Sequence, residues 1–227
     1  MKRIYEKVVQ GTDEWMQLRC GILTASEMHH LVTPSKLEPA WNDAARSYLL
    51  DLAAQRISGF VDASFTSKWM ERGKFDEPYA RDYYADNFEP VRQVGFVSNE
   101  IDGVIIGYSP DGLVGDNGAI EAKSRNPSIQ LGFILDRRIP TQALIQVQTG
   151  MLVAELDWID YVSYSGGLAM AVERVYRDDK IQAAIRRAAV EAEARIKEIV
   201  ARYEKLLEDP EQRLVPTERV VDDIMIL

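Results

Sequence analysis

The feature that most constrains the fold is a set of short β-branched runs between residues 91 and 122. Apolar and polar residues alternate within the runs, which are separated by Asp102-Gly103, Pro110-Asp111-Gly112 and Asp116-Asn117-Gly118. Residues of these types favour tight turns between strands. The stretch therefore predicts an antiparallel meander, in which neighbouring strands bring separated side chains together.

One turn of this meander places an acidic residue beside a Glu-x-Lys segment. Side chains alternate between the two faces of a strand, so Glu121 and Lys123 project together while Ala122 faces the other way. Asp111 ends the preceding strand, and the next hairpin folds it back beside Glu121. Two carboxylates there could hold a hard cation through oxygen, with the backbone carbonyl of Ala122 as a third ligand.

Such a site has the parts that phosphodiester hydrolysis needs. A bound metal polarises a phosphoryl oxygen and lowers the pKa of an attacking water. Asp111 and Glu121 would bind the metal, while Lys123 would position or deprotonate the water or stabilise the developing charge. A Pro-Asp-Gly turn or a Glu-x-Lys strand is common by itself as an ordinary turn or exposed pair. Joined ten residues apart, the two match the Pro-Asp…Glu-x-Lys pattern of the PD-(D/E)XK nuclease superfamily, which favours the functional interpretation.

Helical patterns flank the meander on both sides. Their order predicts one mixed α/β (α+β) domain over residues 1–227. The resemblance to the PD-(D/E)XK superfamily implies a restriction-endonuclease-like core, in which a central mixed sheet is flanked by helices. We expect a break or kink near 76–78, because Pro78 fits the first turn of a helix better than its interior. The other expected elements are helical segments over 14–58, 66–88, 142–153 and about 178–208, a polar loop over 33–39, and strands over 158–164 and 172–176.

Composition and charge narrow the class of protein. The sequence has no segment resembling a secretion signal or a membrane span, and its single cysteine excludes an intrachain disulfide, so we expect a cytoplasmic protein. Two histidines and one cysteine make a zinc site implausible. The net charge of −9 argues, taken alone, against a nucleic-acid binder. Phosphate contact needs only a local basic lining, however, and a divalent-metal site requires carboxylates of its own.

Four segments resemble, in order, the motif set of the phage lambda exonuclease and YqaJ-type viral recombinase family: residues 15–27, 72–80, 109–113 and 145–148. The resemblance implies a Mg²⁺-dependent exonuclease that degrades double-stranded DNA from its ends in the 5′-to-3′ direction. The 3′ single strands left behind would serve recombination by single-strand annealing. It also implies that Mn²⁺ substitutes for Mg²⁺, that two ions act during catalysis, that the enzyme is a homotrimer, and that its partner is an annealing protein in a phage- or prophage-carrying bacterium.

The resemblance also assigns roles to residues outside the meander. Glu77 matches an acidic helical residue that approaches the metal, against the alternative of a solvated carboxylate. The pocket for the DNA 5′-phosphate would comprise Arg19, Ser26, Ser109 and Gln146. The spacing of Thr24 and Glu27 suggests a capping box, which would put Ser26 in the first turn of a helix, where free N–H groups attract an anion.

Other residues of the same segments have weaker assignments. Gln146 and Gln148 lie two apart on a helix, so only one of them is expected to face the site. Gly73 costs about 1 kcal/mol relative to alanine in a helix, which is tolerated only if something needs close approach. Lys36 and Met70 match regions that contact the duplex, although a methionine on a helix more often belongs to the core.

Two other functions remain open at this point. A superfamily endonuclease or junction resolvase would share the metal site but not the terminal-phosphate pocket, and Arg19 would then form an ordinary surface salt bridge, for instance with Glu14. A non-catalytic DNA-end-binding or assembly protein is the third possibility, which the presence of Asp111, Glu121 and Lys123 disfavours. Exposed apolar residues in the last helix or in 220–227 could serve a partner.

Overall fold

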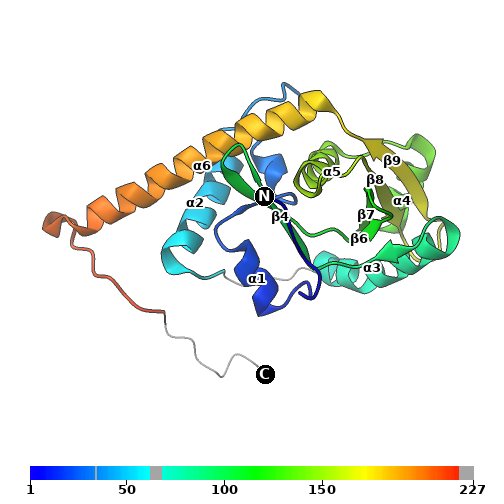
Figure 1. Ribbon diagram of the computed structural model, residues 1–227, viewed down its shortest axis with the longest axis horizontal. Coiled ribbons are helices and arrows are strands. Elements are labelled where there is room, and N and C mark those ends of the chain that lie inside the picture. Colours follow the sequence, from blue (N-terminus) through cyan, green and yellow to red (C-terminus); the bar gives the residue numbers. More distant parts are fainter. Residues whose placement is uncertain (34, 62–67, 220–227) are drawn as a thin grey trace.

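The structure is a computed structural model that describes residues 1–33, 35–61 and 68–219, with the side chains of 68–70 outside that description. Within these ranges no helix has the length and apolar character needed to cross a bilayer. The helices are α1 (Asp13–Arg19), α2 (Asp43–Ser58), α3 (Lys68–Asn87), α4 (Pro127–Asp136), α5 (Thr141–Ala154) and α6 (Asp179–Leu207), with the 3-10 turns η1 (Met28–His30) and η2 (Pro210–Gln212). Figure 1 shows α6 along one side of the molecule, with its end projecting beyond the rest.

The strands form two mixed sheets, where a single central sheet was expected. The first has the order β1 (Arg3–Tyr5), β4 (Phe96–Ile101), β5 (Val104–Tyr108) and β2 (Leu23–Thr24). The second has the order β3 (Val91–Arg92), β6 (Gly112–Val114), β7 (Gly118–Ser124), β8 (Trp158–Tyr164) and β9 (Ala171–Tyr176). The pairs β2–β5 and β7–β8 are parallel and the others are antiparallel. The mixed α/β class is confirmed.

Two helices cover opposite faces of the second sheet, α3 on one side and α5 on the other (Figure 1). Tyr84 of α3 packs against Ile120 and Val162, whereas the neighbouring Ala119 and Tyr161 belong to the cluster that contains α5. The alternation along β7 therefore directs Ile120 towards α3 and Glu121 towards α5, as the period-two pattern predicts. This arrangement fixes the direction in which the carboxylate points.

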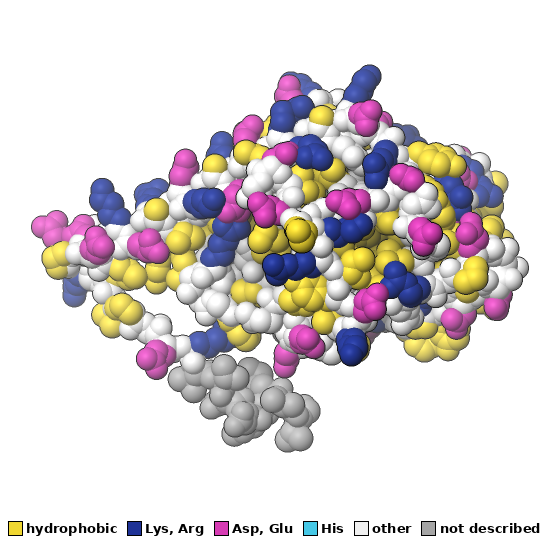
Figure 2. All heavy atoms as spheres, in the orientation of Figure 1, with side chains coloured by type: hydrophobic (Ala, Val, Ile, Leu, Met, Phe, Trp, Pro, Cys, Tyr) yellow, Lys and Arg dark blue, Asp and Glu magenta, His cyan; other side chains and the backbone are white. Residues whose placement is uncertain are grey.

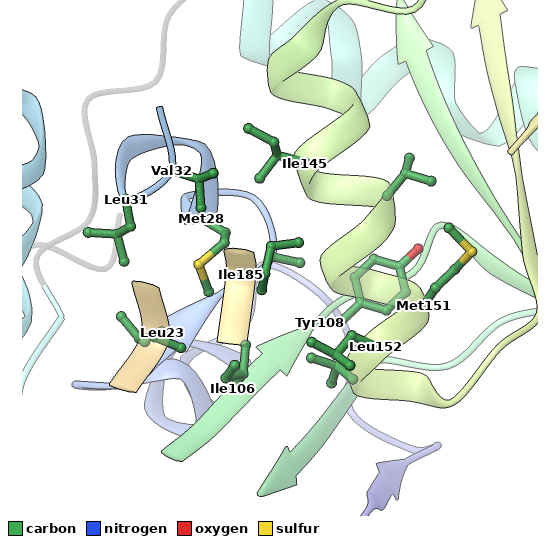
Figure 3. Close-up of a cluster of buried hydrophobic side chains, with 14 of the residues drawn as sticks. Leu23, Met28, Leu31, Val32, Ile106, Tyr108, Ile145, Met151, Leu152 and Ile185 are labelled. Carbon is green, nitrogen blue, oxygen red and sulfur yellow. The ribbon is translucent and has the colours of Figure 1, made fainter. Parts of the chain in front are cut away.

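The larger core joins the first sheet to α2, α5 and α6 (Figure 3). Leu23, Ile106 and Met151 are fully buried within it, and each such side chain contributes about 1.5–3 kcal/mol to folding. A bidentate ion pair of Arg56 with Glu193, at 2.9 and 2.6 Å, ties α2 to α6. The strands β5 and β2 and the helix α5 are thus held in a packed core.

Several elements match the sequence expectations closely. The strand over Trp158–Tyr164 has the expected bounds, and α6 begins after an Asp178 N-cap that accepts from two backbone N–H groups. The turn at Asp102 and Gly103 has positive φ at both positions, as a type I′ hairpin requires. Residues 220–227, whose apolar side chains were considered for a partner, lie outside the described residues.

The helix expected after a Thr24 cap is wrong. Thr24 belongs to β2, where Leu23 and Thr24 pair in parallel with Ile106 and Gly107, and its N–H group donates to the Tyr48 hydroxyl. The element that directly follows this strand is the short 3-10 turn η1, not an α-helix. The backbone groups of β2 form their hydrogen bonds with β5 instead of beginning a helix, so tertiary contacts override the local pattern.

Two further corrections concern α3 and the meander. Helix α3 runs without a break through Pro78; Pro78 and Lys74 are both exposed, so water can bond to the Lys74 carbonyl that loses its helical donor. The meander divides between β5 and β6, which lie in different sheets. The segment Ser109-Pro110-Asp111 crosses from one sheet to the other.

Candidate active site

The crossing segment between the two sheets is held in place through its backbone carbonyls. Gln10 donates its side-chain amide to the carbonyl of Pro110 at 3.0 Å, and Arg81 of α3 donates to the carbonyl of Asp111 at 2.7 Å. The Asp111 carboxylate in turn accepts the backbone N–H of Ala122 at 2.6 Å. The first carboxylate of the motif is therefore fixed beside the strand that carries the second.

Glu121 is almost fully buried, with 2% of its surface exposed. One carboxylate oxygen accepts from the Gln146 amide at 2.6 Å and lies 2.9 Å from the Lys123 ammonium. The other accepts the Tyr108 hydroxyl at 3.3 Å. Lys123 also donates to the Gln146 side-chain oxygen at 3.0 Å, so Gln146 bridges the acid and the base.

Burial and mutual repulsion shape the ionisation of these groups. Burial raises the pKa of Asp111 well above its ordinary value, and the charges of Glu121 and Glu77 raise it further. Burial opposes the charge on Lys123, but Glu121 and Asp111 together outweigh burial and raise its pKa overall. Lys123 is therefore a cation at neutral pH, and the two carboxylates repel each other across the site.

This donor set fits a hard divalent cation. In the described ranges no group of three or more His, Cys, Asp and Glu side chains is arranged to hold a metal by itself. The protein ligands would accordingly be the carboxylates of Asp111 and Glu121 with a backbone carbonyl, which leaves the other positions for water and phosphate oxygens. Mg²⁺ commonly binds in this way, through one or two carboxylates plus substrate. A cation there would also offset the repulsion that raises the pKa of Asp111.

Glu77 lies on α3 beside this pair of carboxylates. Its carboxylate forms a 3.0 Å ion pair with Arg81, one turn later in the helix, while its charge contributes to the raised pKa of Asp111. Arg81 thus contacts both the helical acid and the backbone of the crossing segment. The structure brings Glu77 to the site, but with its carboxylate paired to Arg81.

On the α1 side of the carboxylates lies the candidate phosphate pocket, a cavity of about 210 Å³ that contains every residue expected for it. The Arg19 guanidinium donates to the hydroxyls of Ser109 at 3.3 Å and Ser26 at 3.4 Å. Gln146 lines the same cavity, as do Asp111, Glu121 and Lys123. Burial lowers the pKa of Arg19, which nevertheless stays a cation because the pKa of an arginine lies far above neutral pH.

The helical environment expected for Ser26 is absent. Ser26 comes after β2 and before η1, and its hydroxyl lies 3.3 Å from that of Thr24. A helix N-terminus therefore contributes nothing to this pocket, and the positive charge comes from Arg19. Gln148, in contrast to Gln146, faces away and donates to the carbonyl of Tyr176 at 2.7 Å, so the prediction that only one glutamine faces the site is confirmed.

On the α3 side, a second cavity of about 430 Å³ opens from the same carboxylates. Asp111, Glu121 and Lys123 line both cavities, so they form a shared floor. The α3 wall of this second cavity is formed by Gly73, Lys74, Asp76, Glu77 and Ala80. Lys36 is exposed in its loop and lines neither cavity, while the side chain of Met70 lies outside the described residues.

Four residues of the site were not given a role from the sequence. Trp15 donates its indole N–H to Ser109 at 2.9 Å and lies 4.2 Å from the Arg19 guanidinium. Tyr108 bonds to Glu121, and Gln10 and Arg81 hold the crossing segment. Trp15 and Tyr108 stand within or next to the quoted motifs, which is the one signal that could have indicated them. Arg81 directly follows the segment 72–80 and has the same signal, whereas Gln10 acts through a backbone carbonyl and leaves no sequence pattern.

Comparison with known proteins identifies the family. A model of the YqaJ-like viral recombinase domain matches residues 14–157. The chain belongs to this family. The match covers the four residues expected to bind the phosphate and both motif carboxylates, although it ends before β8. Curated protein sequences give no significant match.

Solved structures agree with the assignment to the YqaJ-like family. An alkaline exonuclease from Laribacter hongkongensis superposes with a TM-score of 0.70 at 31% identity, covering 86% of this chain and 100% of that one. The same enzyme in complex with dAMP gives a TM-score of 0.71. A phage-related exonuclease from Haemophilus somnus 129PT shares the fold, with a TM-score of 0.57 at 15% identity over 80% of this chain and 96% of that one. The fold is PD-(D/E)XK-like, and the family supports a nuclease that acts in recombination.

Proposed function

We propose that this protein is a Mg²⁺-dependent exonuclease that digests double-stranded DNA from its ends in the 5′-to-3′ direction. The observation that carries the proposal is the shared floor. A pocket containing a half-buried arginine adjoins the motif carboxylates, so a terminal phosphate in the pocket would put the next phosphate of the strand near Asp111 and Glu121. An endonuclease or junction resolvase has no use for such a terminal pocket.

The proposed roles of the site residues are to bind the 5′-phosphate, to bind the metal and to orient the attacking water. Arg19, Ser26, Ser109 and Gln146 would hold the 5′-phosphate, with the guanidinium supplying a charged, two-pronged contact. Asp111, Glu121 and the Ala122 carbonyl would hold the metal, which when bound polarises the phosphoryl oxygen and activates water. Lys123, held as a cation by Glu121, would orient the water or neutralise charge that develops on phosphorus.

The rest of the proposal concerns assembly and pathway. Mn²⁺ is expected to substitute for Mg²⁺, with two ions acting during catalysis. A homotrimer around the duplex would allow long digestion before release, and the 3′ single strand would pass to a single-strand annealing protein in the cytoplasm of a phage- or prophage-carrying bacterium. On the face that Figure 2 shows, basic and acidic side chains are interspersed and form no broad basic surface. We expect the contacts with DNA in the cavities and in an enclosed channel.

The test is to incubate the protein with linear and closed-circular duplex DNA, with Mg²⁺ or with EDTA. The proposal expects loss of the linear form alone, only with metal, and release of label from the 5′ end before the 3′ end. Asp111→Asn and Glu121→Gln should fold normally but not digest DNA.

Other outcomes distinguish the alternatives. Cutting of the circle would indicate an endonuclease or resolvase, and metal-independent binding of ends without digestion would indicate a non-catalytic end-binding protein. Earlier release of the 3′ label would reverse the direction. A solution mass near the 25.7 kDa of one chain would contradict the trimer while leaving the chemistry intact.

A further inference from the structure

The second cavity contains a feature that the proposed function does not explain. Gly73 lies within α3, where glycine is a poor helix former, and it lines the cavity that opens from Glu121 and Lys123. A methyl group built at Gly73 would meet no atom of the described residues within 4 Å, its chain neighbours and its own helix backbone aside. The fold itself therefore does not require a glycine at this position.

One reason for a glycine inside a helix is the close approach of another group. Gly150 in α5 illustrates this, since a Cβ atom there would lie 2.8 Å from the Tyr108 ring. For Gly73 no described residue makes such an approach. Gly73 differs from Gly132 of α4, which also has open space around it, because Gly73 lines a cavity and Gly132 lines neither. The open space faces a cavity beside the carboxylates, so the approaching group is expected to be a ligand.

The path of a DNA strand identifies this ligand. This identification rests on the proposed function, in which a strand with its 5′-phosphate against Arg19 places its next phosphate at the shared floor of Asp111, Glu121 and Lys123. Beyond that phosphate the strand must continue out of the floor, and the second cavity opens there. We propose that the second cavity binds the nucleotide on the 3′ side of the scissile bond, and that Gly73 provides the clearance for it.

The other lining residues have the chemistry that a nucleotide needs. Lys74 is exposed at the cavity and supplies a positive charge for a phosphate. Tyr164 supplies an aromatic ring on which a base can stack, and its ring is held by stacking on Tyr83 with centroids 6.1 Å apart. Ser124 is fixed by hydrogen bonds to Asp76 at 2.6 Å and from Arg72 at 3.0 Å. The wall is polar, aromatic and already ordered.

The experiment places side chains in the open space at Gly73 while the fold is retained. Gly73→Ala and Gly73→Leu add side chains of increasing size, and both replace glycine by a better helix former. The matched controls are Gly132→Ala and Gly132→Leu in α4, because Gly132 is also helical, also has open space around a built Cβ, and lines neither cavity. The probes are dAMP, which fills only the phosphate pocket, and a 5′-phosphorylated deoxyadenosine dinucleotide, which reaches both cavities. Binding is measured in Ca²⁺, with chromatography to check that the dinucleotide stays intact.

Opposite effects on stability and binding are expected at position 73. Gly73→Ala should raise Tm by roughly 2–4 °C, while Gly73→Leu should weaken binding of the dinucleotide on the order of tenfold. Both variants should bind dAMP as the wild type does, and KM for duplex ends should rise. The Gly132 variants should bind both probes with wild-type affinity.

Each contrary result has a separate meaning. Wild-type affinity of Gly73→Leu for the dinucleotide would overturn this inference and leave the proposed function standing. Equal weakening for dAMP and the dinucleotide, or equal effects in the Gly132 variants, would show a general distortion and would also overturn it. A wild-type protein that neither binds dAMP nor digests linear DNA would overturn the proposed function together with the inference.

Discussion

Replacing Arg19 tests the terminal-phosphate pocket directly, because the structure separates its role in the fold from its proposed role in binding. Arg19 contacts the hydroxyls of Ser109 and Ser26 at 3.3 and 3.4 Å, long for hydrogen bonds from nitrogen to oxygen. Ser109 keeps its 2.9 Å bond from Trp15 when Arg19 is removed. Arg19→Ala should therefore leave the pocket walls and the unfolding midpoint nearly unchanged.

The loss in binding should be much larger than the loss in stability. A bidentate contact between guanidinium and phosphate is charge-assisted, and removing it costs about 1.5–3 kcal/mol. That corresponds to a loss of roughly ten- to a hundredfold in affinity for the end. Arg19→Lys restores the charge without the two-pronged geometry, so it should recover only part of the affinity.

The assay compares digestion of two duplexes that differ only in a 5′-phosphate or a 5′-hydroxyl, with Arg3→Ala, an exposed arginine of β1, as the control variant. Wild type should prefer the phosphorylated end, Arg19→Ala should lose the preference, and Arg3→Ala should keep it. Equal digestion of both ends by wild type would refute the pocket. So would an Arg19→Ala variant that slows both ends by the same factor.

Three further predictions concern the carboxylates and their support. Tyr108→Phe removes the 3.3 Å hydrogen bond to Glu121. It should lower kcat about three- to tenfold and leave dAMP binding unchanged, since a long bond lies at the weak end of charged hydrogen bonds. An unaltered kcat would exclude a positioning role for Tyr108. Gly150→Ala should lower both Tm and kcat, because crowding of the Tyr108 ring costs about 1–3 kcal/mol against a helix gain of about 1 kcal/mol, and a raised Tm in thermal denaturation would contradict this. Asp111→Asn should stabilise the metal-free protein at neutral pH: the pKa of Asp111 is raised in the folded state, so wild-type stability falls as pH rises from about 3.8 through the raised value. Urea unfolding in EDTA should show the gain of Asp111→Asn at pH 7 and its disappearance near pH 4; a gain that is independent of pH would have another origin.

The parts of the fold that were predictable from sequence are those fixed by periodicity over many residues. The long helix α6 and the strand Trp158–Tyr164 have strong local patterns and appear with nearly the expected bounds. The relation between Asp111 and Glu121 was predictable for the same reason, since alternation in β7 and a tight hairpin determine it. Here local rules and the global fold agree.

The errors lie where a short local signal competes with a tertiary contact. Thr24 has the spacing of a cap, but pairing of β2 with β5 decides its conformation. Helix α4 was not predicted, although Asn126 caps it and Pro127 occupies its first turn. The division into two sheets depends on where the chain crosses at Pro110, and no residue pattern encodes which strands a meander leaves unpaired.

Which residues gather at the candidate site was predictable from the sequence, but the contacts that support them were not. A motif gives the residues expected to bind metal or phosphate, because their chemical type is constrained. Supporting contacts such as Gln10 with Pro110, or Trp15 with Ser109, join positions about a hundred residues apart and could be made by many side chains. Such contacts become visible only when the two sheets are placed together.

The charges along the two cavities bear on how an acidic protein could bind a DNA end at this place, as the proposed function requires. Four acidic side chains and three basic ones line them: Asp76, Glu77, Asp111 and Glu121 against Arg19, Lys74 and Lys123. Without metal the lining is therefore acidic by one charge, which disfavours a phosphate. One divalent ion would change that balance to a positive charge, so the metal and the strand would each favour binding of the other, by the reciprocity that holds for any two linked ligands. The net charge of −9 is a sum over the whole chain, whereas recognition of a DNA end would depend on this local balance and on the ion that shifts it.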